Sequence, residues 1–327
     1  MSERFNADGL ALSSQYAQTM NTLVLPALRA LEKQTTLKGA GGYPLYCVRY
    51  DAETPRGTVL ILHGFTENAF KYAELIYSLL QNGFSVAAFD QAGHGRSRDL
   101  QAGEDASLTD IDRFQDYVDD METVVEQIVS DMPRPWLLFS HSMGGAVSAL
   151  YLEKHPEKFQ RAAFCAPMIA PALGGLPVFA AKLLCCGAKA MGRGGKRIFV
   201  SKPYSGFEDF DTSAATGRAR FDWYEQVKSE HPEFTNNGPT YRWTLESLGV
   251  TQRILQKGEV EKIQCPLRLY TAQLDTSVEP GPQGQFIARV RQGDRVFVEN
   301  ARHEIYRSED EVLFPWWRDV LSFLKEE

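Results

Sequence analysis

The chain passes from an apolar run to a helical pattern around Ser142 with almost no loop between them. Residues 136–140 read Trp-Leu-Leu-Phe-Ser, a run typical of a buried strand, and the apolar residues within 146–151 then recur at helical spacing. Ser142 is therefore expected in a sharp turn at the carboxyl edge of a sheet. Ser140 and Gly144 supply the small neighbours that such a turn requires.

A helix that begins near Met143 would direct free backbone N–H groups and the positive end of its dipole at Ser142. An oxyanion formed on Ser142 would be stabilised there. Ordinary strand-to-helix turns also show a Ser-x-Ser-x-Gly-Gly pattern, so the motif alone is weak evidence. The residues that follow the other strands must decide between the two interpretations.

The charge balance and the cysteines narrow the class of protein. A net charge of −7 argues against nucleic-acid binding, because no excess of basic residues is available to neutralise phosphates. No window holds the ~20 uncharged apolar residues of a membrane span, and the amino-terminal residues lack the apolar core of a secretory signal. The five cysteines are scattered without zinc-ligand spacing. We therefore expect a cytoplasmic protein with reduced thiols and no metal site.

Strand patterns alternate with helical patterns along most of the chain, which predicts an α/β fold on a parallel sheet. The strands are expected at 42–50, 57–62, 84–89, 136–140, 162–166, 266–271 and 295–298. The other helices are expected at 16–33 with an interruption near Pro26, at 70–80, at 114–128 and at 312–324. Residues 171–262 carry no buried-strand run. We expect them to form a helical cap inserted between two strands of a core made of residues 1–170 and 263–327.

A serine hydroxyl needs a base to accept its proton and a third group to hold that base. Of the six histidines, His303 lies in a loop between the last strand and the last helix, and so above the same edge of the sheet as Ser142. We assign His63 and His94 to structural turns, and His155 and His231 to the surface. His141 lies in the sharp turn at Ser142 and is expected to point away from Ser142.

The carboxylate of a triad is expected on another loop at the same edge. Asp275 follows the strand at 266–271, and Glu279 is the competing acid four residues later. Asp275 is favoured because it lies nearer the strand end. The chain order Ser142, Asp275, His303 matches the order of nucleophile, acid and base in one particular fold.

An oxyanion hole needs two N–H donors aimed at the developing charge. Met143 is placed to supply one of them. Phe65, just after His63-Gly64 at the end of a neighbouring strand, is placed to supply the other. The loop at 90–97 also contains a histidine and a serine, but its aspartate and glycines are typical of a tight structural loop.

These motifs resemble those of the α/β-hydrolases, and within them the branch of monoacylglycerol lipases and bacterial inner-membrane lysophospholipases. The motifs that carry the resemblance are His63-Gly64, the loop at 90–97, the elbow His-Ser-Met-Gly-Gly at 141–145, and the stretches at 113–120 and 238–247. The resemblance implies an eight-stranded, mostly parallel sheet flanked by helices. It also implies a triad of Ser142, Asp275 and His303, oxyanion donors at Phe65 and Met143, and a supporting loop with His63, Gly64, His141 and Gly144.

The predicted function is hydrolysis of the acyl ester of lysophospholipids, or of monoacylglycerols, through an acyl-enzyme without a metal or an organic cofactor. Two departures from the motifs of the branch concern the site: Ser140 replaces the first glycine of the elbow, and the acid loop is not a close copy. One alternative is a carboxylesterase or aminopeptidase of the same fold that acts on soluble substrates. The other is a non-catalytic α/β-hydrolase that serves as a receptor or scaffold.

The predicted cap contains a basic segment in an otherwise acidic chain. Between residues 171 and 207 there are six basic residues and no acid: Lys182, Lys189, Arg193, Lys196, Arg197 and Lys202. Val178, Phe179, Leu183, Leu184 and Met191 add apolar surface in the same segment. Such a helix either contacts the inner face of the cytoplasmic membrane or is an ordinary solvated helix over a core. The pattern favours the two interpretations equally.

Overall fold

A computed structural model describes residues 3–98, 105 and 107–326, so the first two residues of the amino-terminal stretch lie outside it. Eight strands form one sheet in the order β1-β2-β4-β3-β6-β7-β9-β10. The strands β1 and β2 pair antiparallel to their neighbours, and all the other pairs are parallel. The bounds are β1 Lys33–Lys38, β2 Pro44–Tyr50, β3 Thr58–Leu62, β4 Ser85–Phe89, β6 Trp136–His141, β7 Arg161–Cys165, β9 Leu267–Ala272 and β10 Gly293–Val298.

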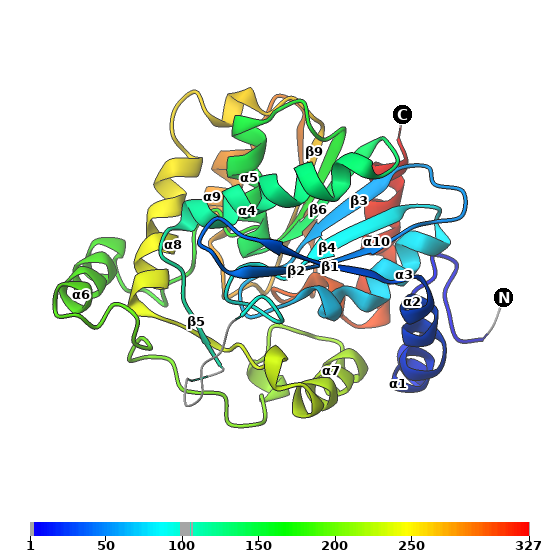
Figure 1. Cartoon of the computed structure of the whole chain (residues 1–327), viewed down its shortest axis with the longest axis horizontal. Coiled ribbons are helices and arrows are strands. Elements are labelled where there is room, and N and C mark those ends of the chain that lie inside the picture. The colour runs from blue at the N-terminus through cyan, green and yellow to red at the C-terminus, as the bar shows by residue number, and fades with distance from the viewer. Residues whose placement is uncertain (1–2, 99–104, 106, 327) are drawn as a thin grey trace.

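Helices cover both faces of this sheet (Figure 1). One apolar cluster packs α4, α5 and α9 against one face, and a second packs α1, α2, α3 and α10 against the other. The bounds of the helices are α1 Tyr16–Thr19, α2 Leu25–Leu31, α3 Ala73–Gln81, α4 Phe114–Gln127, α5 Met143–Lys154, α6 Val178–Ala190, α7 Arg218–Glu230, α8 Tyr241–Ile254, α9 Pro280–Ile287 and α10 Asp310–Lys325.

The strand β6 and the helix α5 form the centre of the fold. Every residue of β6 is buried, with Leu138 facing one apolar cluster and Phe139 the other, as expected for a strand covered on both sides. In α5 all residues from Met143 to Glu153 are buried as well. The turn between the two elements is therefore fixed by packing on every side.

The mostly parallel sheet with its helices and the helical region between two strands were predicted, and both are confirmed. The strand β1 was not predicted, because it is an edge strand whose residues are almost all exposed and so show no apolar alternation. The amino-terminal helix is interrupted near Pro26, as predicted. The α-helical pattern widens to a π turn at Met20–Val24, and Pro26 then lies in the first turn of α2, where a proline is tolerated.

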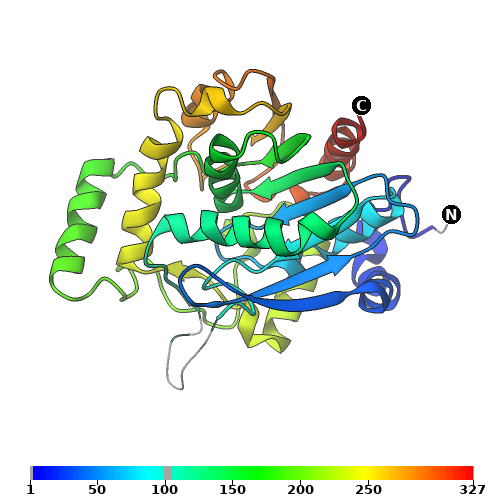
Figure 2. The same ribbon diagram turned by 45° about the horizontal axis from the view of Figure 1, so that its top comes forward.

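The region between β7 and β9 holds α6, α7, α8 and a two-residue strand β8 (Gly238–Pro239), which pairs with β5 (Leu108–Thr109). The helix α7 is fixed to the core by the buried Arg220, which lies 2.9 Å from Glu74 and 2.8 Å from Asp310. The helix α6, by contrast, packs mainly on α8 and projects from one side of the molecule (Figure 2).

Candidate active site

Ser142 lies in a strained turn between β6 and α5. Its φ of 49° and ψ of −116° fall in a backbone region that residues other than glycine rarely adopt. The turn leaves room only for small neighbours: a Cβ on Gly144 would lie 2.5 Å from the carbonyl oxygen of Leu62, and one on Gly145 would overlap Pro167. The side chain of Ser140 fits because the residue is small and fully buried.

The structure brings Ser142, His303 and Asp275 together. Ser142 Oγ lies 2.8 Å from His303 Nε2, and His303 Nδ1 lies 2.7 Å from Asp275 Oδ2. Ser142 is 6% exposed and His303 8%, so both hydrogen bonds are shielded from water. Asp275 also accepts from the amides of Ser277 and Val278. Burial alone would raise the pKa of Asp275, but the contact with His303 and these two amides lower it below its usual value.

Glu279, the competing acid, lies elsewhere. It is exposed at the residue preceding α9, where its amide donates to the carbonyl of Ala170. The contact with His303 is therefore made by Asp275. The preference from the strand end agrees with this geometry, while the catalytic role of Asp275 stays a prediction.

The amide of Met143 follows Ser142 in the chain, the amide of Phe65 follows Gly64, and neither donates to an acceptor within residues 3–98, 105 and 107–326. Gly64 lies close to Ser142, since a Cβ on it would be 3.0 Å from the Cβ of Ser142. The ring of Phe65 stacks at 4.0 Å, between centroids, on that of Trp243 in α8. A tetrahedral oxyanion requires two free N–H donors, and the assignment of this role to Phe65 and Met143 stays a prediction.

His63 and His94 belong to the turns, as expected for structural residues. His63 Nδ1 donates to the carbonyl of Gly64 over 2.7 Å, and its Nε2 accepts from the amide of Gln91 over 2.8 Å. His94 is fully buried, with Nδ1 bonded to Ala92. Burial lowers the pKa of both imidazoles below the usual value. They hold the loop at 90–97 against the end of β3.

His155 and His231 lie at the ends of α5 and α7. His231 is half-exposed and 3.2 Å from Glu233, as a surface histidine would be. His155 is more covered than the sequence analysis predicted, since its ring stacks on Tyr151 and lies 3.1 Å from Glu122. Neither contacts the triad.

A buried hydrogen-bond network beside the triad was largely missed by the sequence analysis. The carboxylate of Glu67 accepts from the amide of Gly64 (2.5 Å), from the hydroxyls of Tyr72 (2.6 Å) and Tyr306 (2.5 Å), and from His141 Nδ1 (3.0 Å). It thus joins the loop after β3, the turn at Ser142 and the loop after β10. The local signals are an acid three residues after Gly64 and a tyrosine five residues after that acid, whereas His141 and Tyr306 come from distant parts of the chain.

Charge in this network is balanced by pairing. Burial raises the pKa of Glu67, but His141 and Lys71 outweigh burial and hold the pKa well below its usual value. Lys71 also lies 2.6 Å from Glu304, the residue after His303. Within the described residues, no group of three or more His, Cys, Asp or Glu side chains could hold a metal ion.

The fold and the site together define a class of protein. An eight-stranded sheet with a serine between β6 and α5, an aspartate after β9 and a histidine after β10 is the arrangement of the α/β-hydrolases. A family model described as serine aminopeptidase, S33 (Hydrolase_4) matches residues 53–311. The chain belongs to this family of α/β-hydrolases.

Curated relatives in this family are lipid hydrolases. The chain is 34% identical over 221 residues to lysophospholipase L2 of Escherichia coli, a match covering 66% of this chain and 64% of that protein. It is 35% identical over 154 residues to monoglyceride lipase of Mus musculus, covering 45% of this chain and 48% of the relative. The matched regions thus span less than two thirds of these relatives, to which the chain is homologous.

Solved structures share the fold at lower identity. A monoglyceride lipase variant from Saccharomyces cerevisiae, solved with a substrate analog, aligns with a TM-score of 0.68 at 20% identity, covering 90% of this chain and 96% of that one. A carboxyl esterase from Bacillus coagulans aligns with a TM-score of 0.69 at 17% identity, covering 90% and 98%. Among the described residues of this chain, no helix has both the length and the apolar character to cross a bilayer.

Proposed function

We propose that this protein is a serine esterase that hydrolyses the acyl ester of lysophospholipids, or of monoacylglycerols, through a triad of Ser142, His303 and Asp275. The observation that carries the proposal is the unbroken chain of hydrogen bonds from Asp275 through His303 to Ser142. Homology to lysophospholipase L2 and to monoglyceride lipases supports the substrate class.

Acylation would begin when His303 Nε2 takes the proton of Ser142 Oγ as the oxygen attacks the ester carbonyl. The carboxylate of Asp275 holds the imidazole in place and stabilises the imidazolium that forms. The amides of Phe65 and Met143 would then hold the oxyanion of the tetrahedral intermediate. The loss of one such donor typically costs about 3 kcal/mol of barrier.

Collapse of this intermediate would transfer the proton from His303 to the departing glycerol oxygen and leave an acyl-enzyme on Ser142. His303 would next deprotonate a water that attacks the acyl carbonyl. A second tetrahedral intermediate would release the fatty acid and return the proton to Ser142. The scheme uses neither a metal nor an organic cofactor. His63, Gly64, His141 and Gly144 support the loops that carry these groups.

Residues 171–262 are proposed to act as a cap over a core made of residues 1–170 and 263–327. The stacking of Trp243 on Phe65 supports this role, because it places α8 directly against the oxyanion loop. Arg220 anchors the other side of the same region to the core.

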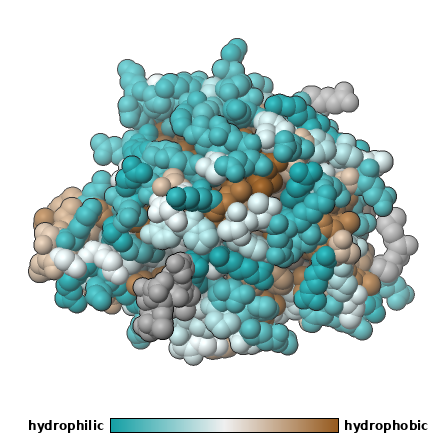
Figure 3. Space-filling model, viewed as in Figure 1, coloured by the Kyte–Doolittle hydropathy of each residue, from teal (hydrophilic) through white to brown (hydrophobic). Residues whose placement is uncertain are grey.

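Peripheral contact with the inner face of the cytoplasmic membrane is proposed for α6 and its flanks. Phe179 is 74% exposed and Leu183 72%, and apolar surface covers the lobe over α6 (Figure 3). Lys189 is exposed on the same helix, and each basic residue near anionic lipid contributes about 1 kcal/mol. Arg193 lies beyond the end of α6.

Liposome sedimentation tests this contact. Binding to phosphatidylglycerol liposomes should fall with added salt and with Leu183→Glu. Phe297→Glu is the matched control, because Phe297 is also exposed but lies on β10. Equal binding to neutral and anionic liposomes would remove the proposal.

A carboxylesterase or aminopeptidase acting on soluble substrates is the second candidate, and membership of a family described as serine aminopeptidases favours the aminopeptidase. The deciding measurement is release of fatty acid from lysophospholipids and monoacylglycerols of graded chain length, beside short esters and aminoacyl amides. A lipid esterase should turn over faster with longer chains and lose activity in Ser142→Ala. A non-catalytic receptor or scaffold would leave a fluorophosphonate probe unattached to Ser142.

A further inference from the structure

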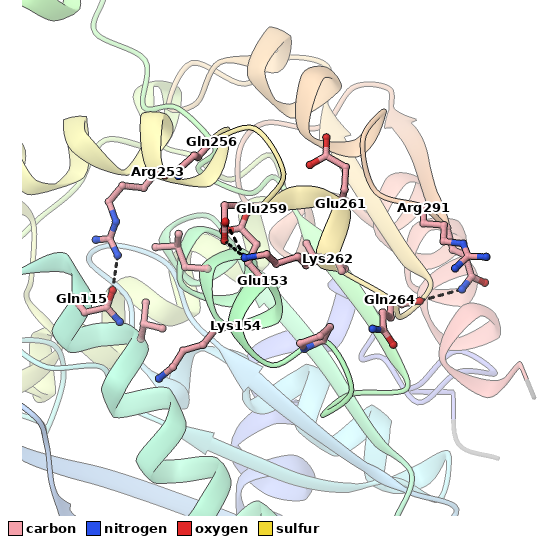
Figure 4. A pocket seen from close by; sticks show the side chains of 15 residues that line it. Gln115, Glu153, Lys154, Arg253, Gln256, Glu259, Glu261, Lys262, Gln264 and Arg291 are labelled. Atoms are coloured by element: carbon pink, nitrogen blue, oxygen red, sulfur yellow. Dashed lines mark hydrogen bonds and ion pairs between the residues drawn. The ribbon is translucent and has the colours of Figure 1, made fainter.

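A cavity of about 1010 Å³ lies between α4, the carboxyl end of α5 and the segment that follows α8 (Figure 4). Its place on α5 separates it from the triad. Glu153 follows Ser142 by eleven positions along this helix, which corresponds to roughly 16 Å along the axis. The proposed esterase mechanism uses none of its lining residues.

Glu153 is one of the residues that line this cavity. The residue is 6% exposed, and its Oε1 atom makes no hydrogen bond within the described part of the chain. The apolar side chains of Val118, Leu150 and Ile263 line the cavity beside it. A buried carboxyl group without a partner destabilises the fold, because folding removes its hydration and supplies no hydrogen bond to replace it.

The cations around Glu153 are already engaged. Lys262 is bound to Glu259 at 2.7 Å, and Lys154 to Glu122 at 2.7 Å. Arg253 donates to Gln115 across the opening of the cavity (Figure 4).

The pKa of Glu153 follows from these surroundings. Burial raises it to about 8, and the charge of Glu259 adds to the increase. The positive charges of Lys262, Arg289 and Arg253 lower this pKa, but each of these side chains has another partner. The partner of Arg289 is Glu261.

We propose that this cavity binds a small organic ammonium ion, whose N–H groups donate to Glu153 and whose aliphatic part lies on Val118, Leu150 and Ile263. A metal ion fits poorly, because no cluster of ligating side chains occurs among the described residues. A polyamine fits poorly as well, because Arg253 and Lys154 would repel a second positive charge. A monoamine on an alkyl stem satisfies both the carboxylate and the apolar wall.

Calorimetric titration of the full-length protein with hexylammonium tests the proposal. Hexylammonium should bind, whereas 1-hexanol and hexanoate, which share its stem, should bind at least tenfold more weakly. Glu153→Gln should weaken the binding of hexylammonium at least tenfold. Glu126→Gln is the matched control, because it removes one exposed carboxylate from α4 outside the cavity and should leave the affinity unchanged. Equal affinities for the three probes, or no effect of Glu153→Gln, would overturn the proposal.

The wild-type protein provides a second test that does not depend on the folding of a variant. The ammonium ion competes with the proton of Glu153. Its affinity should therefore increase about tenfold with each unit of rising pH up to about pH 8, and should stay constant above that pH. Phosphate and borate buffers, which contain no amine, suit this measurement. An affinity that does not change between pH 6 and pH 8 would contradict the site.

Discussion

The ring of His141 joins the elbow to the loop of the proposed base, because His141 Nε2 lies 3.1 Å from the backbone carbonyl of His303. On its other side, His141 Nδ1 lies 3.0 Å from the carboxylate of Glu67. Both partners can only accept hydrogen bonds, so the imidazole carries a proton on each nitrogen. The protonated ring of His141, the residue before the proposed nucleophile, thus links Glu67 to the backbone of His303 and fixes the position of His303.

Replacing His141 should slow catalysis without removing the nucleophile. In His141→Gln, one donor to either Glu67 or the carbonyl of His303 is lost, and we expect kcat/KM to fall by roughly 10- to 100-fold. Ser142 should still react with a fluorophosphonate probe, but more slowly. Unchanged kcat/KM would show that the loop of His303 is fixed by its other contacts.

The stability contributed by His141 should depend on pH. Burial by itself lowers the pKa of His141, but the carboxylate of Glu67 outweighs burial and raises the pKa above the ordinary value. The folded state therefore holds this proton more tightly than the unfolded state does. The contribution is full below about pH 6.5 and disappears as pH rises through the raised pKa. Denaturant unfolding of wild type and His141→Gln between pH 6 and pH 10 should show their difference in unfolding free energy shrinking with pH.

Gly144→Ala should destabilise the protein and impair the elbow. The new Cβ would lie 2.5 Å from the carbonyl oxygen of Leu62 and 2.7 Å from that of His63, and both are backbone atoms that cannot turn away. We expect a loss of about 1–3 kcal/mol of unfolding free energy. Gly249→Ala in α8 is the control: no atom lies within 4 Å of its Cβ, so it should gain about 0.5–1 kcal/mol. Thermal melts of both variants check these opposite changes, and a gain of stability in Gly144→Ala would show that helix propensity outweighs the close packing at this position.

Asp275→Asn should lower kcat by roughly 10³- to 10⁴-fold, because the amide no longer holds the imidazole in the tautomer that accepts the proton of Ser142. Glu279→Gln should leave kcat within about twofold, since surface changes away from a site have small effects. Assays of both variants on one lysophospholipid separate the two acids. Comparable losses in the two would reject the assignment of Asp275.

Glu153→Gln should stabilise the protein at alkaline pH. Because burial raises the pKa of Glu153 to about 8, folding favours its protonated form. The unfolded state releases this proton from about pH 4.5 upward, so the wild type loses stability as pH rises from about 4.5 to 8. The cost is about 1.4 kcal/mol for each unit by which the pKa is raised. Unfolding free energies of both proteins should therefore diverge between pH 5 and pH 8, and parallel curves would contradict the burial of this charge.

Local pattern was enough to predict the parts of the protein that short stretches determine. The buried strand β6, the turn at Ser142 and the helix α5 follow from a short continuous apolar run that is replaced within a few residues by apolar residues at helical spacing. The parallel sheet follows from the alternation of such patterns. Because loops after parallel strands meet at one edge, the sequence also indicated which loops would approach Ser142.

The tertiary structure alone decided what depends on partners far apart in the chain. Only the fold could give the exposed edge strand β1 a neighbour to pair with, and only the fold could choose Asp275 over Glu279 as the contact of His303. The same holds for Glu67 and Glu153, two buried acids that differ in their hydrogen-bond partners. Glu67 accepts from His141 and Tyr306, whereas Oε1 of Glu153 has no hydrogen-bond partner among the described residues, because burial and pairing arise from the packing of distant segments rather than from neighbours in sequence.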